Sequence, residues 1–167
     1  GKFGQDYAAA GLSKSIPLYG PGFLTDGTLE AQGDAAQGML TTLHYADGLN
    51  TPRDNAFRAA YTAAYRSAPD VYAVQGYDSA QLLATGLDAV KGDVKQRDAL
   101  VAAMGKAKID SPRGMFTLSR SHEPVQDSYL RKVEGNKKQA VGRAVTGRRD
   151  PTPRPHNVPP PRRPPPR

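Results

Sequence analysis

The 167-residue sequence contains no cysteine and no tryptophan, and only three histidines. Without cysteine the chain forms no disulfide and no thiolate metal site, although this absence does not identify a cellular compartment. His44, His122 and His156 are far apart and lack the His-x-x-x-His spacing of a zinc motif. We therefore expect no metal site.

Long apolar runs are also missing. No stretch approaches the roughly 20 apolar residues that cross a bilayer, so no transmembrane helix is predicted. The chain begins at Gly1, without methionine, inside a stretch that has the pattern of a helix. We therefore expect a fragment of a longer protein, and the lack of a signal peptide in this stretch says nothing about export.

Motifs of catalysis are absent as well. The sequence has no Gly-x-Ser-x-Gly elbow and no Gly-x-x-x-x-Gly-Lys-Ser/Thr phosphate loop, and Gly20, Gly22 and Gly27 do not form a dinucleotide fingerprint. The acidic residues are scattered rather than paired as in an acid–base site. An enzyme is therefore the least favoured class, and no cofactor is expected.

The net charge of +7 comes mainly from the C-terminal end. Residues 148–167 contain six arginines, one aspartate and nine of the 15 prolines, which leaves +2 for residues 1–147. This composition predicts a disordered tail with polyproline II character. The tail fits a ligand for an SH3-like groove, an electrostatic contact with nucleic acid, or a segment produced by frame slippage. Because the tail has no aromatic residue, nucleic acid is the weaker of the two partners.

The clearest element is a helix over residues 70–91. Pro69 and Asp70 favour a helix start, and Gly92 favours its end. Apolar residues recur at steps of three and four, which predicts one buried stripe. The stripe consists of Ala73, Tyr77, Ala80, Leu83, Ala84, Leu87 and Val90.

Helices and short strands alternate along the rest of the chain. The end of a helix is predicted over residues 2–12, with Gly11 as its cap, and Thr51 as N-cap with Pro52 in the first turn predicts the start of another. A third is predicted over 93–106 and a weak one over 28–38. Strands are predicted at residues 15–19, 39–45, 115–118 and 128–133. This order favours an α/β layered fold.

The loop Gly20–Gly27 contains two unusually apolar residues, Phe23 and Leu24. A loop at the carboxyl end of a strand lies where α/β proteins bind ligands, so these side chains could line a cleft. The alternative is that Phe23 packs on the core. Tyr72, at the start of the long helix, has the same two interpretations, a cleft wall or a packing residue.

Five segments, in order, carry a family resemblance. They are Tyr19-Gly-Pro-Gly-Phe, Gly33-Asp-Ala-Ala-Gln-Gly, Pro69-Asp-Val-Tyr-Ala-Val-Gln-Gly-Tyr-Asp-Ser-Ala, Ser111-Pro-Arg-Gly and Pro124-Val-Gln-Asp-Ser-Tyr-Leu. Over residues 2–145 the chain resembles the C-terminal half of periplasmic substrate-binding proteins of the branched-chain amino-acid (leucine-binding) type, which serve ABC importers.

The resemblance implies a partial type I periplasmic-binding-protein-like fold with pieces of both doubly wound α/β lobes. Residues 1–46 would belong to the C-terminal lobe and residues 47–124 to the N-terminal lobe. Residues 125–147 would return to the C-terminal lobe, ahead of the disordered tail 148–167. The breaks at residues 47–52 and 119–127 would be hinge crossings.

The resemblance also implies ligand-binding residues. Leucine binders carry, after the Gly-Pro pair of this loop, an acid that pairs with the ammonium group of the ligand. Gly22 and Phe23 occupy those positions here, which favours an aromatic or other organic carboxylate over an α-amino acid. We expect the ligand to contact Gly22, Phe23, Leu24 and, from the other lobe, Tyr72.

The predicted function is that of the solute-binding component of an ABC importer, which binds an amino acid or an organic carboxylate by lobe closure. The expected setting is the periplasm, and the expected partners are the small ligand and the transporter permease. We expect a monomer without catalytic activity, metal or nucleic acid. The alternative is an interaction module that docks on a protein or nucleic acid through the Pro/Arg tail.

Overall fold

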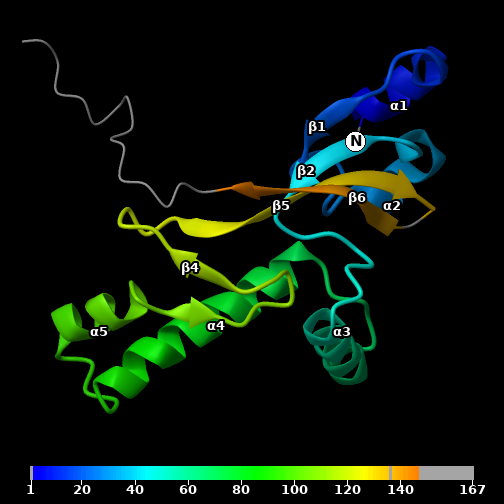
Figure 1. Cartoon of the computed structure of the whole chain (residues 1–167). Coiled ribbons are helices and arrows are strands. Elements are labelled where there is room, and N and C mark those ends of the chain that lie inside the picture. Colours follow the sequence, from blue (N-terminus) through cyan, green and yellow to red (C-terminus); the bar gives the residue numbers. More distant parts are fainter. Residues whose placement is uncertain (1, 136, 147–167) are drawn as a thin grey trace, which may run out of the picture.

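The computed structural model describes residues 2–135 and 137–146, which form two regions (Figure 1). The first, named here the sheet region, contains β1 (Tyr19–Pro21), β2 (Leu40–Leu43), β5 (Pro124–Glu134) and β6 (Lys137–Thr146). Its helical segments are α1 (Lys2–Ala9), α2 (Leu29–Gln32) and the 3-10 turns Leu12–Lys14, Gly22–Leu24 and Gly33–Ala36. The predicted disordered tail, residues 148–167, lies outside the described residues.

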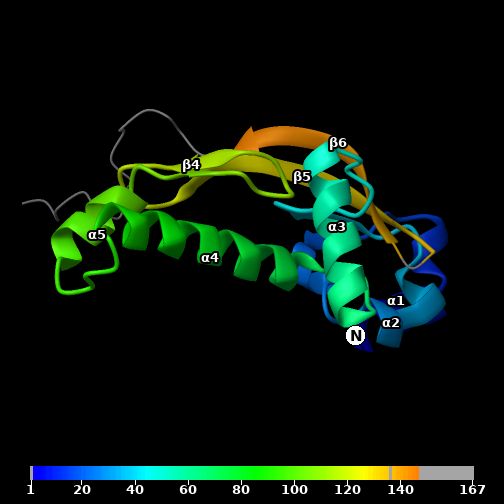
Figure 2. The same ribbon diagram turned by 90° about the horizontal axis from the view of Figure 1, so that it is seen from below.

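The second, named here the helical region, lies between β2 and β5 in the chain. It contains α3 (Pro52–Tyr65), α4 (Val71–Ala89), α5 (Arg97–Met104), β3 (Lys108–Ile109) and β4 (Phe116–Leu118). Seen from below, the long α4 runs under β4 and β5 toward α5, while α3 lies across the other end of α4 (Figure 2).

One strand, β5, joins the two regions. The sheet has the order β1-β2-β5-β4-β3, with β6 also paired to β5. Residues Tyr129–Lys132 of β5 pair antiparallel with β2, whereas Pro124 and Val125 pair with β4. The predicted lobe boundaries at residues 46/47 and 124/125 stay a prediction, and the second falls within this shared strand.

The helix starts follow the predicted capping chemistry. The Thr51 side chain accepts a hydrogen bond from Asp54 N, and Asp70 accepts one from Ala73 N, at 3.1 and 2.9 Å. These caps satisfy backbone N–H groups that a helix leaves unpaired at its first turn. They explain why α3 and α4 begin where the sequence predicted.

The predicted buried stripe of α4 is wrong for its middle part. Ala80, Leu83 and Ala84 are exposed, and the buried positions are Val71, Val74, Asp78 and Gly86. Two features orient this face inward. Asp78 accepts a hydrogen bond from the buried Arg113. Gly86 allows α5 to approach closely, because a Cβ at this position would lie 2.7 Å from Met104 Cγ.

The strand predictions differ in extent from the structure. The predicted strand 15–19 is mostly a turn, and β1 begins only at Tyr19. β5 is longer than the predicted 128–133, and β3 and β6 were not predicted. β6 follows the turn at Gly135, where φ is +60°, a conformation that glycine adopts without strain.

Buried apolar residues form three small clusters rather than one core. They centre on Tyr45, Phe57, Val71 and Val74; on Ala36, Met39 and Val133; and on Ala107, Ile109 and Phe116. Between them, large apolar side chains remain exposed in both regions. The buried apolar residues of the described ranges are therefore divided among three separate clusters.

Candidate ligand-binding site at the junction of the two regions

The loop Gly20–Gly27 leaves the carboxyl end of β1 as a tight turn. A Cβ on Gly22 would lie 2.6 Å from Leu43 Cδ1, so only glycine fits this approach to β2. Thr25 N and Asp26 N both donate to Gly22 O at 3.0 Å, which closes the turn. The loop therefore has a fixed shape.

The two apolar side chains of this loop point in different directions. Phe23 is 62% exposed, so it does not fold back on the core. Leu24 packs on the cluster of Ala36, Met39 and Val133. Of the predicted contact residues, Leu24 thus faces the interior, while Gly22 offers only backbone and Phe23 offers a free ring.

Tyr72 lies beside the end of the same loop. It is in the first turn of α4 and is 47% exposed. Its Cε2 atom is 4.0 Å from the position that a Cβ on Gly27 would occupy. The structure thus brings Tyr72 to the loop that carries Phe23, across the junction between the regions.

A buried arginine that the sequence interpretation did not identify fixes the loop. Arg131, on β5, is 1% exposed. Its guanidinium donates hydrogen bonds, all between 2.5 and 3.3 Å, to oxygens of three segments. The acceptors are Thr41 Oγ1, Tyr45 O, Gly22 O, Thr25 Oγ1 and Asp26 Oδ2. One side chain therefore ties the loop to β2 and to the segment that leaves β2.

Charged pairs continue from this arginine toward the helical region. Lys138 Nζ lies 3.6 Å from Asp26 Oδ1 and 3.8 Å from Asp47 Oδ2, and Arg58 Nη1 lies 3.5 Å from Asp47 Oδ1. Arg58 also donates to the Tyr45 hydroxyl, which in turn donates to Asp54 Oδ1, both at 2.9 Å. Burial raises the pKa of Tyr45 and of Asp54. The network spans the segment that passes from β2 to α3.

An uncharged hydrogen bond also joins the sheet region to the helical region. His44, just after β2, shares a hydrogen bond of 3.2 Å with the Gln75 amide on α4. Burial, together with the nearby Arg113 and Arg131, lowers the pKa of His44 to about 4, although Asp26 partly opposes this shift. His44 is therefore neutral at pH 7.

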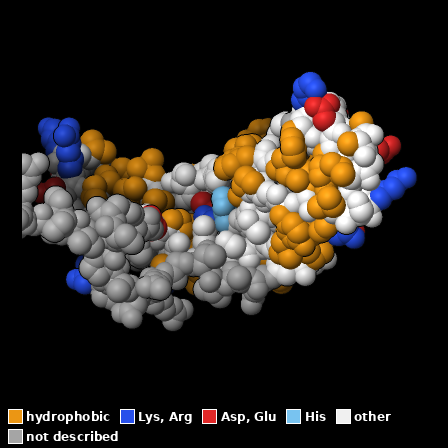
Figure 3. All heavy atoms as spheres, turned by 90° about the horizontal axis from the view of Figure 1, so that it is seen from above, with side chains coloured by type: hydrophobic (Ala, Val, Ile, Leu, Met, Phe, Trp, Pro, Cys, Tyr) orange, Lys and Arg blue, Asp and Glu red, His pale blue; other side chains and the backbone are white. Residues whose placement is uncertain are grey.

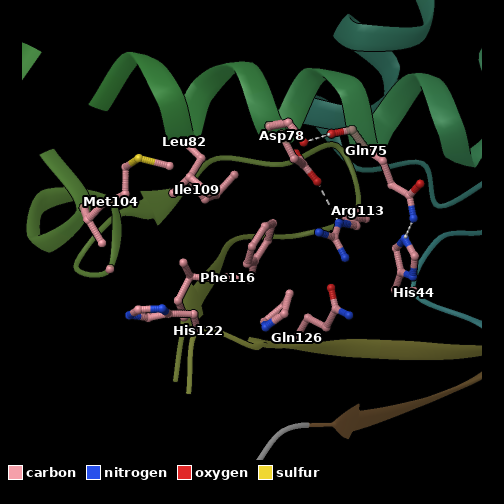
Figure 4. Close-up of a pocket in the computed structure, with 15 residues that line it drawn as sticks. His44, Gln75, Asp78, Leu82, Met104, Ile109, Arg113, Phe116, His122 and Gln126 are labelled. Carbon is pink, nitrogen blue, oxygen red and sulfur yellow. Dashed lines mark hydrogen bonds and ion pairs between the residues drawn. The ribbon is translucent and has the colours of Figure 1, made fainter. Parts of the chain in front are cut away.

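A cavity of about 520 Å³ extends from this histidine along α4 (Figure 4). Its apolar part is formed by Leu82, Met104, Ile109, Phe116 and neighbouring side chains. At the other part Arg113 Nε donates to Asp78 Oδ2 at 2.8 Å, and the guanidinium lies 4.2 Å from the ring centre of Phe116. Burial lowers the pKa of Arg113, but its pairing with Asp78 opposes that shift.

The surface seen from above has a hollow between two raised ends (Figure 3). Histidine and charged side chains lie in the hollow, and hydrophobic side chains gather on both sides of it. Such a mixture of apolar walls and few polar groups is typical of small-molecule sites.

Within the described ranges there is no group of three or more His, Asp or Glu side chains placed to hold a metal ion. In the same ranges no helix is long and apolar enough to cross a membrane.

Comparison with known proteins identifies the family. Residues 1–139 match the family described as periplasmic binding protein. The chain belongs to the periplasmic binding protein family. A Leu/Ile/Val-binding protein homologue from Brucella abortus is 34% identical over 139 residues, which are 78% of this chain and 35% of that protein. The family assignment confirms the resemblance inferred from the five sequence segments.

Solved periplasmic binding proteins share the fold. A solute-binding protein of an ABC transporter from R. palustris, in complex with benzoate, is 50% identical, with a TM-score of 0.81 over 90% of this chain. Another, from Rhodopseudomonas palustris BisB5 in complex with 3,4-dihydroxybenzoic acid, is 33% identical, with a TM-score of 0.74 over 87%. These matches confirm the predicted partial type I periplasmic-binding-protein-like fold.

The chain spans about two-fifths of the length of these solved relatives, 41% and 42%. The matched family is that of periplasmic binding proteins, and the two solved relatives are solute-binding proteins of ABC transporters. Whether Gly22, Phe23, Leu24 and Tyr72 contact a ligand stays a prediction.

Proposed function

We propose that this chain is part of the solute-binding component of an ABC importer. It would bind a small organic carboxylate, aromatic by preference, when two lobes close over it in the periplasm. A monomer would then deliver the ligand to the transporter permease. The observation that carries this proposal is the junction itself, where the exposed Tyr72 of the helical region lies beside Gly27, at the end of the loop that carries the exposed Phe23.

The chemistry of the junction supports an aromatic ligand. Two exposed aromatic side chains offer flat apolar surfaces, on which a ring gains from burial and from ring–ring contact. Two related proteins that were solved with benzoates are 50% and 33% identical to this chain. The polar groups for the carboxylate would come partly from residues outside this chain, because the chain covers only about two-fifths of those relatives.

The test uses a complete clamp. The 167-residue chain is joined to the portion of the benzoate-bound R. palustris protein that it does not cover, and benzoate binding is measured by isothermal titration calorimetry. We expect the fused clamp to bind benzoate, and the 167-residue chain alone to bind it at least 100-fold more weakly. Phe23→Ala and Tyr72→Ala should each weaken binding about tenfold, which corresponds to about 1.4 kcal/mol.

The matched control is Phe3→Ala. Phe3 is as exposed as Phe23, 63% against 62%, but it lies on α1. This variant should bind benzoate as the unmodified clamp does. A clamp that binds no small carboxylate, or that is unaffected by both junction variants, contradicts the proposal.

A further inference from the structure

Tyr45 is attached to both regions of the molecule. It follows β2 by two residues and is 2% exposed. Its backbone oxygen accepts a 3.2 Å hydrogen bond from Arg131 Nη1, on β5 of the sheet region. Its ring lies in the apolar cluster with Phe57, Val71 and Val74, which belong to α3 and α4. The main chain and the side chain of this one residue are therefore held by two different regions.

The hydroxyl group of Tyr45 fixes the position of its ring relative to α3. It donates a hydrogen bond to Asp54 Oδ1 and accepts one from Arg58 Nη1, both 2.9 Å long. Both partners lie on α3, and Asp54 is fully buried. A hydroxyl has a single proton to donate, so one orientation satisfies both bonds at once. Any shift of α3 along the ring would break a buried hydrogen bond, which is costly.

The main chain next to Tyr45 is bound to the sheet region in several places. Asp47 N donates to Lys138 O, and Lys138 N donates to Asp47 Oδ2, both at 2.9 Å. The guanidinium of Arg131 joins the backbone oxygen of Tyr45 to that of Gly22, in the loop after β1. The main chain of Tyr45 therefore keeps a fixed position relative to this loop.

These contacts form a short path between the two exposed aromatic residues of the junction. Arg131 binds the backbone of the loop that carries Phe23 and also the backbone of Tyr45. Tyr45 lies in the same cluster as Val71, whose neighbour in the first turn of α4 is Tyr72. A displacement of the Tyr45 ring would thus change the distance between Phe23 and Tyr72.

We infer that Tyr45 is a positioning residue, whose buried hydroxyl fixes the helical region relative to the ligand loop and so sets the distance between Phe23 and Tyr72. The proposed function concerns what binds at the junction, whereas this inference concerns how the two regions are held before anything binds. It can therefore be tested in the chain without a ligand.

The first test measures the distance between the regions in the 167-residue chain. Spin labels on Asp34→Cys and Leu83→Cys are followed by double electron–electron resonance. Tyr45→Phe removes the hydroxyl, keeps the ring and should at least double the width of the distance distribution. Asp54→Ala should widen it likewise, whereas Asp54→Asn keeps an oxygen acceptor and should leave it unchanged. Tyr45→Phe combined with Asp54→Ala should widen it no more than either alone, because both remove the same bond.

Label pairs within one region separate positioning from structural damage. Lys14→Cys with Asp34→Cys reports on the sheet region, and Asn55→Cys with Leu83→Cys reports on the helical region. Both widths should stay unchanged in every variant. If they grow as well, Tyr45 supports local structure instead of the junction, and the inference is overturned. An unchanged width between the regions in Tyr45→Phe and Asp54→Ala overturns it too.

The second test uses the fused clamp and benzoate. Tyr45→Phe should weaken benzoate binding about fivefold, because the ligand must then order two side chains that the hydroxyl otherwise holds in place beforehand. The matched control, Tyr65→Phe, removes a hydroxyl from an exposed tyrosine of α3 and should leave the affinity unchanged.

The two tests distinguish this inference from the proposed function. A Tyr45→Phe clamp that binds benzoate as tightly as the unmodified clamp overturns the inference and leaves the proposed function standing. A clamp that binds no small carboxylate contradicts the proposed function, and the label distances in the 167-residue chain then decide the inference alone.

Discussion

The two regions place their contributions to the junction by different physical means. In the sheet region, the loop that carries Phe23 is fixed by one buried arginine with hydrogen bonds to three segments. In the helical region, Tyr72 is placed by a capped helix whose first turn packs through Val71 and Val74 on an apolar cluster. The position of Phe23 thus depends on a few strong polar contacts, and the position of Tyr72 depends on ordinary helix packing.

This difference has consequences for tolerance to substitution. If a buried guanidinium loses its carboxylate partner, an unpaired positive charge remains in the interior. If the guanidinium itself is removed, the carboxylate remains there unpaired. The helical region spreads its stability over a cap and a small apolar cluster, while part of α4 lies open. We therefore expect the sheet region to respond sharply to single polar changes and the exposed face of α4 to respond little.

The largest effect is expected for Arg131→Met. It removes the cation from Asp26 and the donors from the carbonyl oxygens of Gly22 and Tyr45. The free energy of unfolding should fall by about 3–5 kcal/mol, the range for a buried pair that loses one partner. Urea unfolding followed by circular dichroism measures it.

The neighbouring Lys132→Met is the control for that substitution. Lys132 pairs with Glu134 at the surface, where both side chains are about half exposed. A surface pair contributes about 0–1 kcal/mol, so the loss should stay within that range. Equal losses for the two variants would contradict the expectation that the sheet region responds sharply to the loss of a buried polar partner.

A smaller effect is expected from pH at the contact between His44 and Gln75. The pKa of His44 is about 4 in the folded chain and 6.5 in the unfolded chain, so below pH 6.5 the unfolded state takes up the proton first. Stability is thus complete above that pH and is lost as the pH falls toward 4. Allowing for solvent screening of a half-buried ring, we expect a loss of about 1 kcal/mol between pH 7 and pH 5.

His44→Gln provides the comparison for this pH dependence. The variant has no group at this position that titrates in that range, so its unfolding free energy should change less between pH 7 and pH 5 than that of the unmodified chain. Parallel pH profiles for the two proteins would show that His44 is not the source.

The smallest effect is expected on the open face of α4. Leu83 is 49% exposed, whereas Val74 is fully buried on the same helix. In the 167-residue chain Leu83→Asp should change the free energy of unfolding by less than about 0.5 kcal/mol, as surface substitutions usually do. In the fused clamp, Leu83→Asp should become destabilising if added residues cover this face.

Val74→Asp should abolish cooperative unfolding of the helical region, because it buries a charge.

The sequence predicted the elements whose signals are local. Caps and turn residues gave the starts of α3 and α4, since Thr51 and Asp70 act on their own helices. The predicted apolar stripe of α4 was wrong only for its middle part, Ala80 to Ala84, because small apolar residues recur on more than one side of this helix. Asp78 and Gly86 determine which side of α4 is buried, because they contact residues that lie further along the chain.

The candidate site was only partly predictable for the same reason. Phe23 and Tyr72 could be selected from their types and positions, although their role stays a prediction. Arg131 was missed because a charge in a strand normally indicates a solvent-facing position. One signal could have found it: Tyr129, Arg131 and Val133 alternate on one face of β5, and all three are buried. Its partners, however, come from segments 86 to 109 residues away.

The measurement that tests the central claim most directly is a distance across the junction. Because the chain has no cysteine, spin labels can be placed at two sites only, Asp34→Cys in the sheet region and Leu83→Cys in the helical region. In the fused clamp, double electron–electron resonance should show one distance distribution without ligand and a different one with saturating benzoate, as expected for lobe closure. Identical distributions under saturating benzoate would contradict the assignment of the two regions to two moving lobes.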